Sequence, residues 1–274
     1  MKKHNFSAGP SILSQDVFSK SSKSILELDN IGLSVLEISH RSKEFVKIME
    51  DARSLSLELL DLNQDEYTSL FLQGGASMQF LMVAYNFLST NASYIDTGTW
   101  STKAMKEAKL FGKVNELASS KDKNYNYIPK ELNQSDNAQY LHLTSNNTIF
   151  GTQWNSFPTP ASKESYLVAD MSSDIFSREF DIKDFGLIYA GAQKNIGPAG
   201  VTLVIIRESI LQSVTRDIPT MMQYQTHINK ESMFNTPPVM SIYAVNQSLR
   251  WLDSIGGVSN MELKNKRKAK KLYD

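Results

Sequence analysis

Short apolar runs of strand character alternate with helical segments along this chain of 274 residues. This order favours an α/β fold with a mainly parallel sheet and helices on both faces. The strand-like runs cover residues 67–73, 93–96, 140–144, 166–170, 187–191 and 201–206. The helical segments cover residues 43–60, 78–88 and 102–111 and continue from 244 to the end, with a break at 256–257. No repeat of fixed period competes with this interpretation.

The lengths of the connections predict the direction of the strands. Sixteen residues separate Asp170 from Leu187, which is enough for a parallel crossover, whereas nine residues separate Gly191 from Val201 and favour an antiparallel return. We therefore expect a mostly parallel sheet with one antiparallel strand. Ligands of such sheets bind beyond the carboxyl ends of the parallel strands. The loops expected there are 74–77, 97–101, 144–148, 171–173 and 192–196.

The composition excludes several classes of function. Lys plus Arg and Asp plus Glu both total 29, so no overall basic charge is available to hold nucleic acid or an anionic membrane. The absence of cysteine excludes thiolate nucleophiles and cysteine-ligated metals, and four histidines leave little room for another metal site. The first residues lack the apolar segment of a signal peptide, and the apolar stretch 80–88 is too short to span a bilayer. We expect a cytoplasmic protein.

Lys194 and Asp170 are the strongest candidates for chemistry. Lys194 follows a buried strand in a bend rich in glycine and proline, where partial burial would lower the pKa of the amine and make it a nucleophile. Asp170 ends an apolar strand, where a carboxylate requires a cation. If the two strands are neighbours, an amine and an acid share one crevice, as pyridoxal phosphate requires. The alternatives are an exposed surface lysine and a helix N-cap.

A glycine-rich turn at 74–77 precedes a predicted helix and offers backbone N–H groups to a phosphate, although such turns are often plain connections. Trp100, expected in a loop, could stack on a planar ring or pack in the core. His40 and Arg41 precede another predicted helix, where the guanidinium could bind an anion or lie free on the surface. Residues 235–238 offer hydrogen-bonding side chains or simply begin a helix.

Several motifs, taken together, resemble those of the phosphoserine aminotransferases, class-V pyridoxal-phosphate enzymes with the aspartate-aminotransferase-like fold. The match is collinear over the whole chain. Its most specific part is the segment 190–200, Ala-Gly-Ala-Gln-Lys-Asn-Ile-Gly-Pro-Ala-Gly. The other matching segments are 5–10, 39–41, 73–80, 96–100, 147–148, 169–173 and 233–238.

The resemblance implies a role for each matching position at the cofactor. Lys194 would carry pyridoxal phosphate as a Schiff base and then transfer the proton. Asp170 would pair with the ring nitrogen, Trp100 would stack on the ring, and Thr148 would bond near the ring hydroxyl. The cofactor phosphate would be held by Ala76, Ser77 and Gln193.

The resemblance also implies a homodimer and a substrate pair. Asn235 and Thr236 would reach the cofactor phosphate of the neighbouring subunit, while His40 and Arg41 would bind the distal acid group of the substrate. The reaction would transfer an amino group reversibly from L-glutamate to 3-phosphooxypyruvate, giving O-phospho-L-serine and 2-oxoglutarate in serine biosynthesis. Some relatives also accept a four-carbon substrate in pyridoxine biosynthesis.

This chain differs from the family pattern in two ways. Some members carry arginine where this chain has Ser77. The family also extends past residue 274 into a small domain with an arginine for the substrate α-carboxylate. We expect an N-terminal arm at 1–15, a cofactor-binding large domain at 16–250, and at 251–274 the start of a small domain whose remainder is absent. The alternative functions are a cofactor-binding but catalytically impaired dimeric fragment and a nucleotide-binding module.

Overall fold

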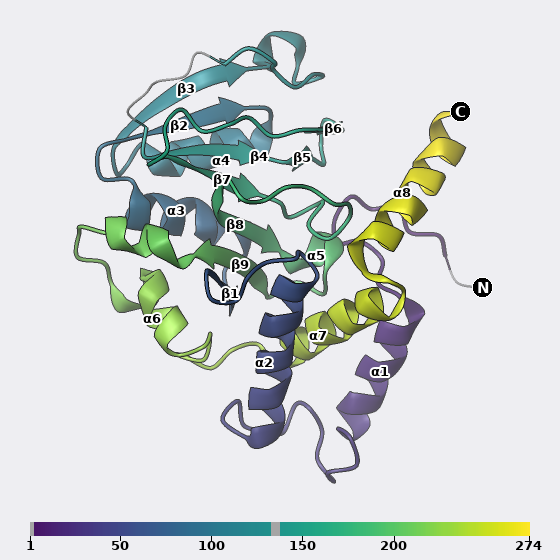
Figure 1. Cartoon of the computed structure of the whole chain (residues 1–274). Helices are drawn as coiled ribbons and strands as arrows, with labels where there is room; N and C mark the ends of the chain where they lie inside the picture. Colours follow the sequence, from purple (N-terminus) through teal and green to yellow (C-terminus); the bar gives the residue numbers. More distant parts are fainter. Residues whose placement is uncertain (1–2, 133–137) are drawn as a thin grey trace.

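A seven-stranded mixed sheet forms the centre of the computed structural model, which describes residues 3–132 and 138–274 (Figure 1). The first two residues of the expected arm lie outside this description. The strand order is β1-β9-β8-β7-β4-β2-β3. The strands are β1 Tyr67–Leu72, β2 Asn91–Asp96, β3 Lys113–Ser119, β4 Tyr140–Thr144, β7 Tyr166–Asp170, β8 Phe185–Gly191 and β9 Thr202–Arg207, with a separate hairpin of β5 Asn146–Asn147 and β6 Thr152–Gln153.

Helices cover both faces of the sheet, as the sequence predicts. Helices α3 and α4 share one apolar cluster with the sheet, and α2 and α7 share another on its opposite face. The helices are α1 Gln15–Leu26, α2 Lys43–Glu58, α3 Gly75–Phe87, α4 Thr99–Ala108, α5 Ala192–Asn195, α6 Tyr224–Asn229, α7 Val239–Ser254 and α8 Gly257–Tyr273, with short 3-10 turns at Lys121–Lys123, Glu208–Ser213 and Thr220–Met222. None of the helices in the described part of the chain is long and apolar enough to cross a membrane.

The strand directions confirm the predicted topology. Strands β2, β3, β4, β7 and β8 pair in parallel, and β9 is antiparallel to both of its neighbours, β8 and β1. The crossover between β7 and β8 is long enough for a helix but consists of turns. Because β7 and β8 are adjacent, their carboxyl ends, Asp170 and Gly191, lie at the same edge of the sheet.

The local sequence explains where the first two helices begin. The hydroxyl of Ser14 accepts a hydrogen bond from the Val17 amide and caps α1, and Ser42 caps α2 in the same way through the Phe45 amide. The expected break at residues 256–257 is present, since α7 ends at Ser254 and α8 begins at Gly257. The boundary expected at 250/251 therefore falls within the last turn of α7, and the division into domains stays a prediction.

A buried histidine lies in the cluster under α3 and α4. His142 Nε2 lies 2.7 Å from the Tyr189 hydroxyl, and burial lowers the pKa of His142 to about 3. An unfolded chain takes up a proton on histidine near pH 6.5, so the stability present above that pH is lost as the pH falls toward about 3. The loss is at most about 1.4 kcal/mol per pH unit.

We predict that His142→Gln reduces the pH dependence of the free energy of unfolding between about pH 6 and 4.5. The reduction should be about 1.4 kcal/mol per pH unit, the contribution of the buried histidine. Urea titrations at a series of pH values measure it. Tyr189→Phe is the matched control, because it removes the same hydrogen bond but keeps the imidazole, and it should retain the steeper slope. Equal slopes in His142→Gln and the parent protein would contradict the prediction.

Candidate active site

The carboxyl ends of β4, β7 and β8 bring three loops together. Ser145, just after β4, donates its backbone N–H to the Asp170 carbonyl at 3.0 Å, and the Met171 N–H bonds to the Tyr189 carbonyl at 2.9 Å. The loop that follows β4 carries Thr148, and the segment that follows β8 forms α5 and carries Lys194. The parallel sheet thus positions the predicted lysine, acid and threonine at one edge.

Lys194 extends its half-buried side chain toward Thr148 and Trp100. Its Nζ donates to Thr148 Oγ1 at 2.8 Å and lies 5.0 Å from the centroid of the Trp100 ring. The indole N–H of Trp100 donates to the same hydroxyl oxygen at 3.4 Å. Burial lowers the pKa of the Lys194 amine, although the Asp170 charge opposes this effect. The amine is therefore neutral, and nucleophilic, at a lower pH than that of a free lysine.

The N-terminal arm packs against the backbone of this lysine. Ser11 donates its N–H to the Gln193 carbonyl at 3.0 Å and its hydroxyl to the Lys194 carbonyl. A Cβ placed on Gly9 would lie only 2.9 Å from Lys194 Cγ, so the arm touches the side chain as well. These contacts involve the backbone and the first carbons of the lysine, whereas Nζ donates to Thr148.

Asp170 is 4% exposed and carries its carboxylate into the same region. Among the described residues, the carboxylate accepts two hydrogen bonds. Both end on Oδ1 and come from Ser172, one from its N–H at 3.0 Å and one from its hydroxyl at 2.6 Å. Burial raises the pKa of Asp170, and the Ser172 hydrogen bonds and the Lys194 charge oppose that rise. The bond from the Ser172 amide is of the kind an N-cap makes, but turns follow Asp170 instead of an α-helix.

Trp100 lies in a helix and not in the loop that the sequence predicts. Helix α4 begins at Thr99, because the Ser101 hydroxyl accepts hydrogen bonds from the N–H groups of Thr97 and Gly98, both at 3.0 Å. A capping serine placed inside the first turn was the signal that the sequence prediction missed. The helix places the Trp100 ring beside Thr148.

The glycine turn leads directly into α3, with Ala76 and Ser77 in its first turn. The helix has no side-chain cap, so its first N–H groups are available to an anion. Gly74 and Gly75 have φ of +93° and +67°, which favour glycine. Among the described residues, no hydrogen bond or ion pair joins Ala76 or Ser77 to Lys194.

The two glycines differ in the space around them, which gives a matched pair of variants. A Cβ on Gly74 would lie 2.5 Å from Met78 Cβ, whereas a Cβ on Gly75 would meet nothing within 4 Å. We predict that Gly75→Ala costs about 1 kcal/mol of unfolding free energy through backbone strain alone. Gly74→Ala should cost about 1–3 kcal/mol more through overpacking. Urea unfolding measures both, and equal costs would contradict the prediction.

The other candidate residues for the cofactor are Gln193 and residues 235–236. The Gln193 side chain folds back over Gly191, within the lysine segment. The Thr236 carbonyl accepts a hydrogen bond from the Gln73 side chain at 2.8 Å, which places 235–236 beside the glycine turn of the same chain.

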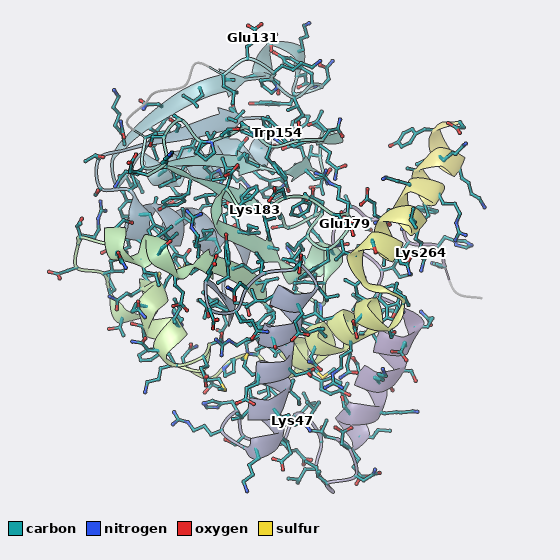
Figure 2. All side chains as sticks on the ribbon, viewed as in Figure 1. Lys47, Glu131, Trp154, Glu179, Lys183 and Lys264 are labelled. Carbon is teal, nitrogen blue, oxygen red and sulfur yellow. The ribbon has the colours of Figure 1, made fainter. Side chains whose placement is uncertain are left out.

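His40 and Arg41 lie away from Lys194 of the same chain. They precede α2 at the end of this helix that lies away from α5, the end marked by Lys47 (Figures 1 and 2). The Arg41 Nε donates to His40 Nε2 at 3.3 Å. Their expected role in binding the substrate stays a prediction.

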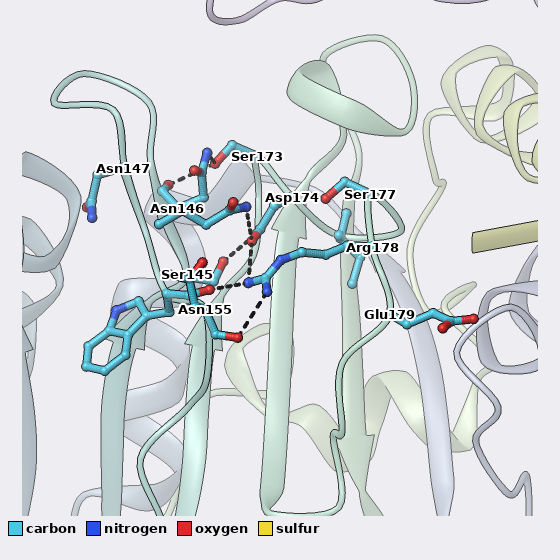
Figure 3. A network of polar contacts seen from close by, with 12 residues as sticks. Ser145, Asn146, Asn147, Asn155, Ser173, Asp174, Ser177, Arg178 and Glu179 are labelled. Carbon is cyan, nitrogen blue, oxygen red and sulfur yellow. Dashed lines mark hydrogen bonds and ion pairs between the residues drawn. The ribbon is translucent and has the colours of Figure 1, made fainter. Parts of the chain in front are cut away.

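A second buried acid, Asp174, was not included in the sequence prediction. Figure 3 shows it beside Ser145 and Arg178. The Asp174 side chain is 2% exposed and accepts hydrogen bonds from the Ser145 hydroxyl and, at 3.2 Å, from Gln153 Nε2. Arg178 Nη2 lies 3.6 Å from its Oδ2. Burial raises the pKa of Asp174, and these partners oppose the rise. The cluster joins the hairpin that carries Thr148 to the turns after Asp170.

The residues present fit the cofactor that the sequence resemblance implies. Pyridoxal phosphate needs an amine, an acid for its ring nitrogen and a site for its phosphate. Lys194 supplies the amine, Asp170 keeps Oδ2 available beyond the two bonds on Oδ1, and the uncapped start of α3 suits a phosphate.

Known proteins match this chain over its whole length. The aminotransferase class-V family matches residues 3–274. A phosphoserine aminotransferase of Flavobacterium psychrophilum is 58% identical over 275 residues, which cover 100% of this chain and 76% of that protein.

Two solved structures are also similar. The phosphoserine aminotransferase of Bacillus circulans subsp. alkalophilus is 44% identical with a TM-score of 0.94, covering 98% of this chain and 75% of that one. A PLP-bound phosphoserine aminotransferase of Trichomonas vaginalis is 34% identical with a TM-score of 0.93, covering 99% and 81%. The chain thus spans about three quarters of the Flavobacterium and Bacillus proteins.

Proposed function

The chain belongs to the aminotransferase class-V family, and on that premise we propose that it is a pyridoxal-phosphate-dependent phosphoserine aminotransferase. The observation that carries the proposal is the environment of Lys194. Its amine is half-buried, bonded to Thr148 and within the electrostatic influence of the buried Asp170. An isolated surface lysine would have none of these neighbours.

Lys194 acts first as a nucleophile and then as an acid and base. Burial lowers the pKa of the Lys194 amine, so Nζ would be available to bond to the cofactor aldehyde at a lower pH than the amine of a free lysine. With the cofactor bound, Lys194 Nζ would be the base that takes the proton from the substrate Cα and the acid that gives the proton back. Thr148 accepts a hydrogen bond from Nζ and so orients the amine.

Asp170 would hold a proton on the ring nitrogen of the cofactor through its Oδ2. When bound, pyridoxal phosphate supplies a protonated ring that accepts the electrons left on the substrate carbon. Trp100 would stack on the ring and Thr148 would bond near the ring hydroxyl. The phosphate would be held by the first turn of α3, which contains Ala76 and Ser77, together with Gln193. Burial of Asp170 strengthens its interaction with the ring nitrogen by excluding water.

We infer that the substrates are L-glutamate and 3-phosphooxypyruvate, giving 2-oxoglutarate and O-phospho-L-serine in serine biosynthesis. The relatives that support this inference carry the name phosphoserine aminotransferase and match the whole chain. His40 and Arg41 are assigned to the distal acid group of both substrates, because a guanidinium binds a phosphate or a carboxylate with two parallel hydrogen bonds.

The positions of these residues favour a site shared between two copies of the chain. His40 and Arg41 lie at the end of α2 away from α5, so a second copy is the simplest source of these side chains for a given Lys194 (Figure 1). Asn235 and Thr236 are assigned to the cofactor phosphate of the neighbouring subunit. The proposal is therefore a homodimer with two shared sites.

The amino-transfer half-reaction tests the proposed activity. The protein loaded with pyridoxal phosphate is mixed rapidly with L-glutamate, and the absorption of the bound cofactor is followed. Conversion to the amino form of the cofactor, with release of 2-oxoglutarate, is expected. A loaded protein whose spectrum does not change would favour the alternative of a cofactor-binding fragment that does not turn over.

Mixing two inactive variants tests the shared site. Lys194→Ala and Arg41→Ala are each combined with pyridoxal phosphate, then mixed, dissociated and reassociated. A heterodimer has one site with both changes and one with neither, so about a quarter of the parent activity is expected. No recovery would mean that Arg41 and Lys194 serve the same site within one chain.

A further inference from the structure

The hydroxyl of Ser172 connects the acid of the site to the strand that precedes the lysine. It donates to Asp170 Oδ1 at 2.6 Å and accepts a hydrogen bond from the Gly191 N–H at 3.0 Å. Gly191 is the last residue of β8 and the N-cap of α5, three residues before Lys194. One buried side chain, 5% exposed, therefore links the two groups on which the chemistry depends.

These hydrogen bonds make the two oxygens of the Asp170 carboxylate different from each other. Oδ1 accepts hydrogen bonds from both the hydroxyl and the N–H of Ser172, so its acceptor positions are used within the protein. Oδ2 is then the oxygen available to a ligand. A hydrogen bond to a carboxylate stabilises its charged form against the cost of burial, and it prevents rotation that would exchange the two oxygens.

We propose that Ser172 is a positioning residue for amino transfer, whose hydroxyl fixes the Asp170 carboxylate against the lysine-bearing segment and reserves Oδ2 for the ring nitrogen of the cofactor. This inference rests on the proposed function. Ser172 does not touch the substrate or the reacting atoms and acts only through Asp170.

The adjacent Ser173 provides a matched control. Its hydroxyl donates to the Asn146 carbonyl at 2.8 Å and accepts from Asn146 Nδ2 at 2.8 Å. It lies in the same turn but makes no bond with Asp170. A loss caused merely by loosening this turn would appear in Ser173→Ala as well as in Ser172→Ala.

The first test measures how the apoproteins bind pyridoxal phosphate. We expect Ser172→Ala to bind about tenfold more weakly than the parent protein, because a charge-assisted hydrogen bond is lost. We also expect the pH midpoint of the visible absorption to rise by about one unit. A ring nitrogen that is protonated less fully repels the positive charge at the Lys194 linkage less. Ser173→Ala should leave the affinity and the midpoint unchanged.

A double-mutant cycle then tests the route through Asp170. In an Asp170→Asn background the ring nitrogen is no longer held by a carboxylate, so Ser172→Ala should change the affinity and the midpoint little further. The proposal is overturned if Ser172→Ala matches the parent protein, if Ser173→Ala shifts equally, or if the Ser172→Ala effects persist undiminished beside Asp170→Asn. Failure of the parent protein to bind the cofactor would instead refute the proposed function, and this inference with it.

Discussion

Replacing Lys194 by alanine is expected to lower the rate of amino transfer by at least about 10⁴-fold, because the nucleophile and the proton carrier are the same atom. The visible absorption band of the Schiff base that the cofactor forms with Lys194 should disappear as well. Steady-state rates and absorption spectra of the loaded variant measure the two effects.

Lys103 offers a matched control for the loss of a cation at the site. Its Nζ lies 4.9 Å from the centroid of the Trp100 ring, almost the same distance as that of Lys194, but the residue is exposed. Lys103→Ala should keep the visible absorption of the cofactor. The assignment of Lys194 would be contradicted if Lys194→Ala kept this absorption or if Lys103→Ala lost it.

Replacing Asp170 by asparagine is expected to lower the rate by roughly 10²–10⁴-fold, because a buried charge pair with the ring nitrogen, worth about 3–5 kcal/mol when one partner is removed, is lost. Asparagine keeps the shape and an acceptor for the Ser172 hydroxyl, so the fold should persist. Single-turnover rates with L-glutamate separate this effect from weaker substrate binding.

Asp174→Asn is the control for this second prediction. Asp174 is also a buried acid, but its partners are Ser145, Gln153 and Arg178, and no role in binding the cofactor is assigned to it. This variant should unfold at a lower urea concentration and keep the cofactor spectrum. A rate loss in Asp174→Asn as large as that in Asp170→Asn, with the cofactor fully bound, would contradict a specific role for Asp170.

The sequence predicted the sheet well because its signals are local. The apolar strands, the glycine turn before α3 and the short return between Gly191 and Val201 each depend on a few adjacent residues. The edge strand β3 was not predicted, because Lys113–Ser119 lacks a clear apolar run. Trp100 was assigned to a loop because the cap of α4 depends on Ser101, which lies within the helix.

The structure brings several of the candidate residues together, whereas their polar partners were not predicted from the sequence. Lys194, Asp170 and Thr148 stand at the ends of predicted strands, so topology alone places them at one edge. The bond from Ser172 to Gly191 and the cluster of Asp174 and Arg178 join segments whose contact depends on loop packing. No pattern of spacing in a single sequence encodes such contacts.

Reduction of the cofactor linkage tests the central claim most directly. The protein is loaded with pyridoxal phosphate, treated with borohydride, digested and mapped by mass spectrometry. Our account predicts that the phosphopyridoxyl group is found on the peptide that contains Lys194. A label predominantly on another lysine, or a protein that takes up no label, would contradict it.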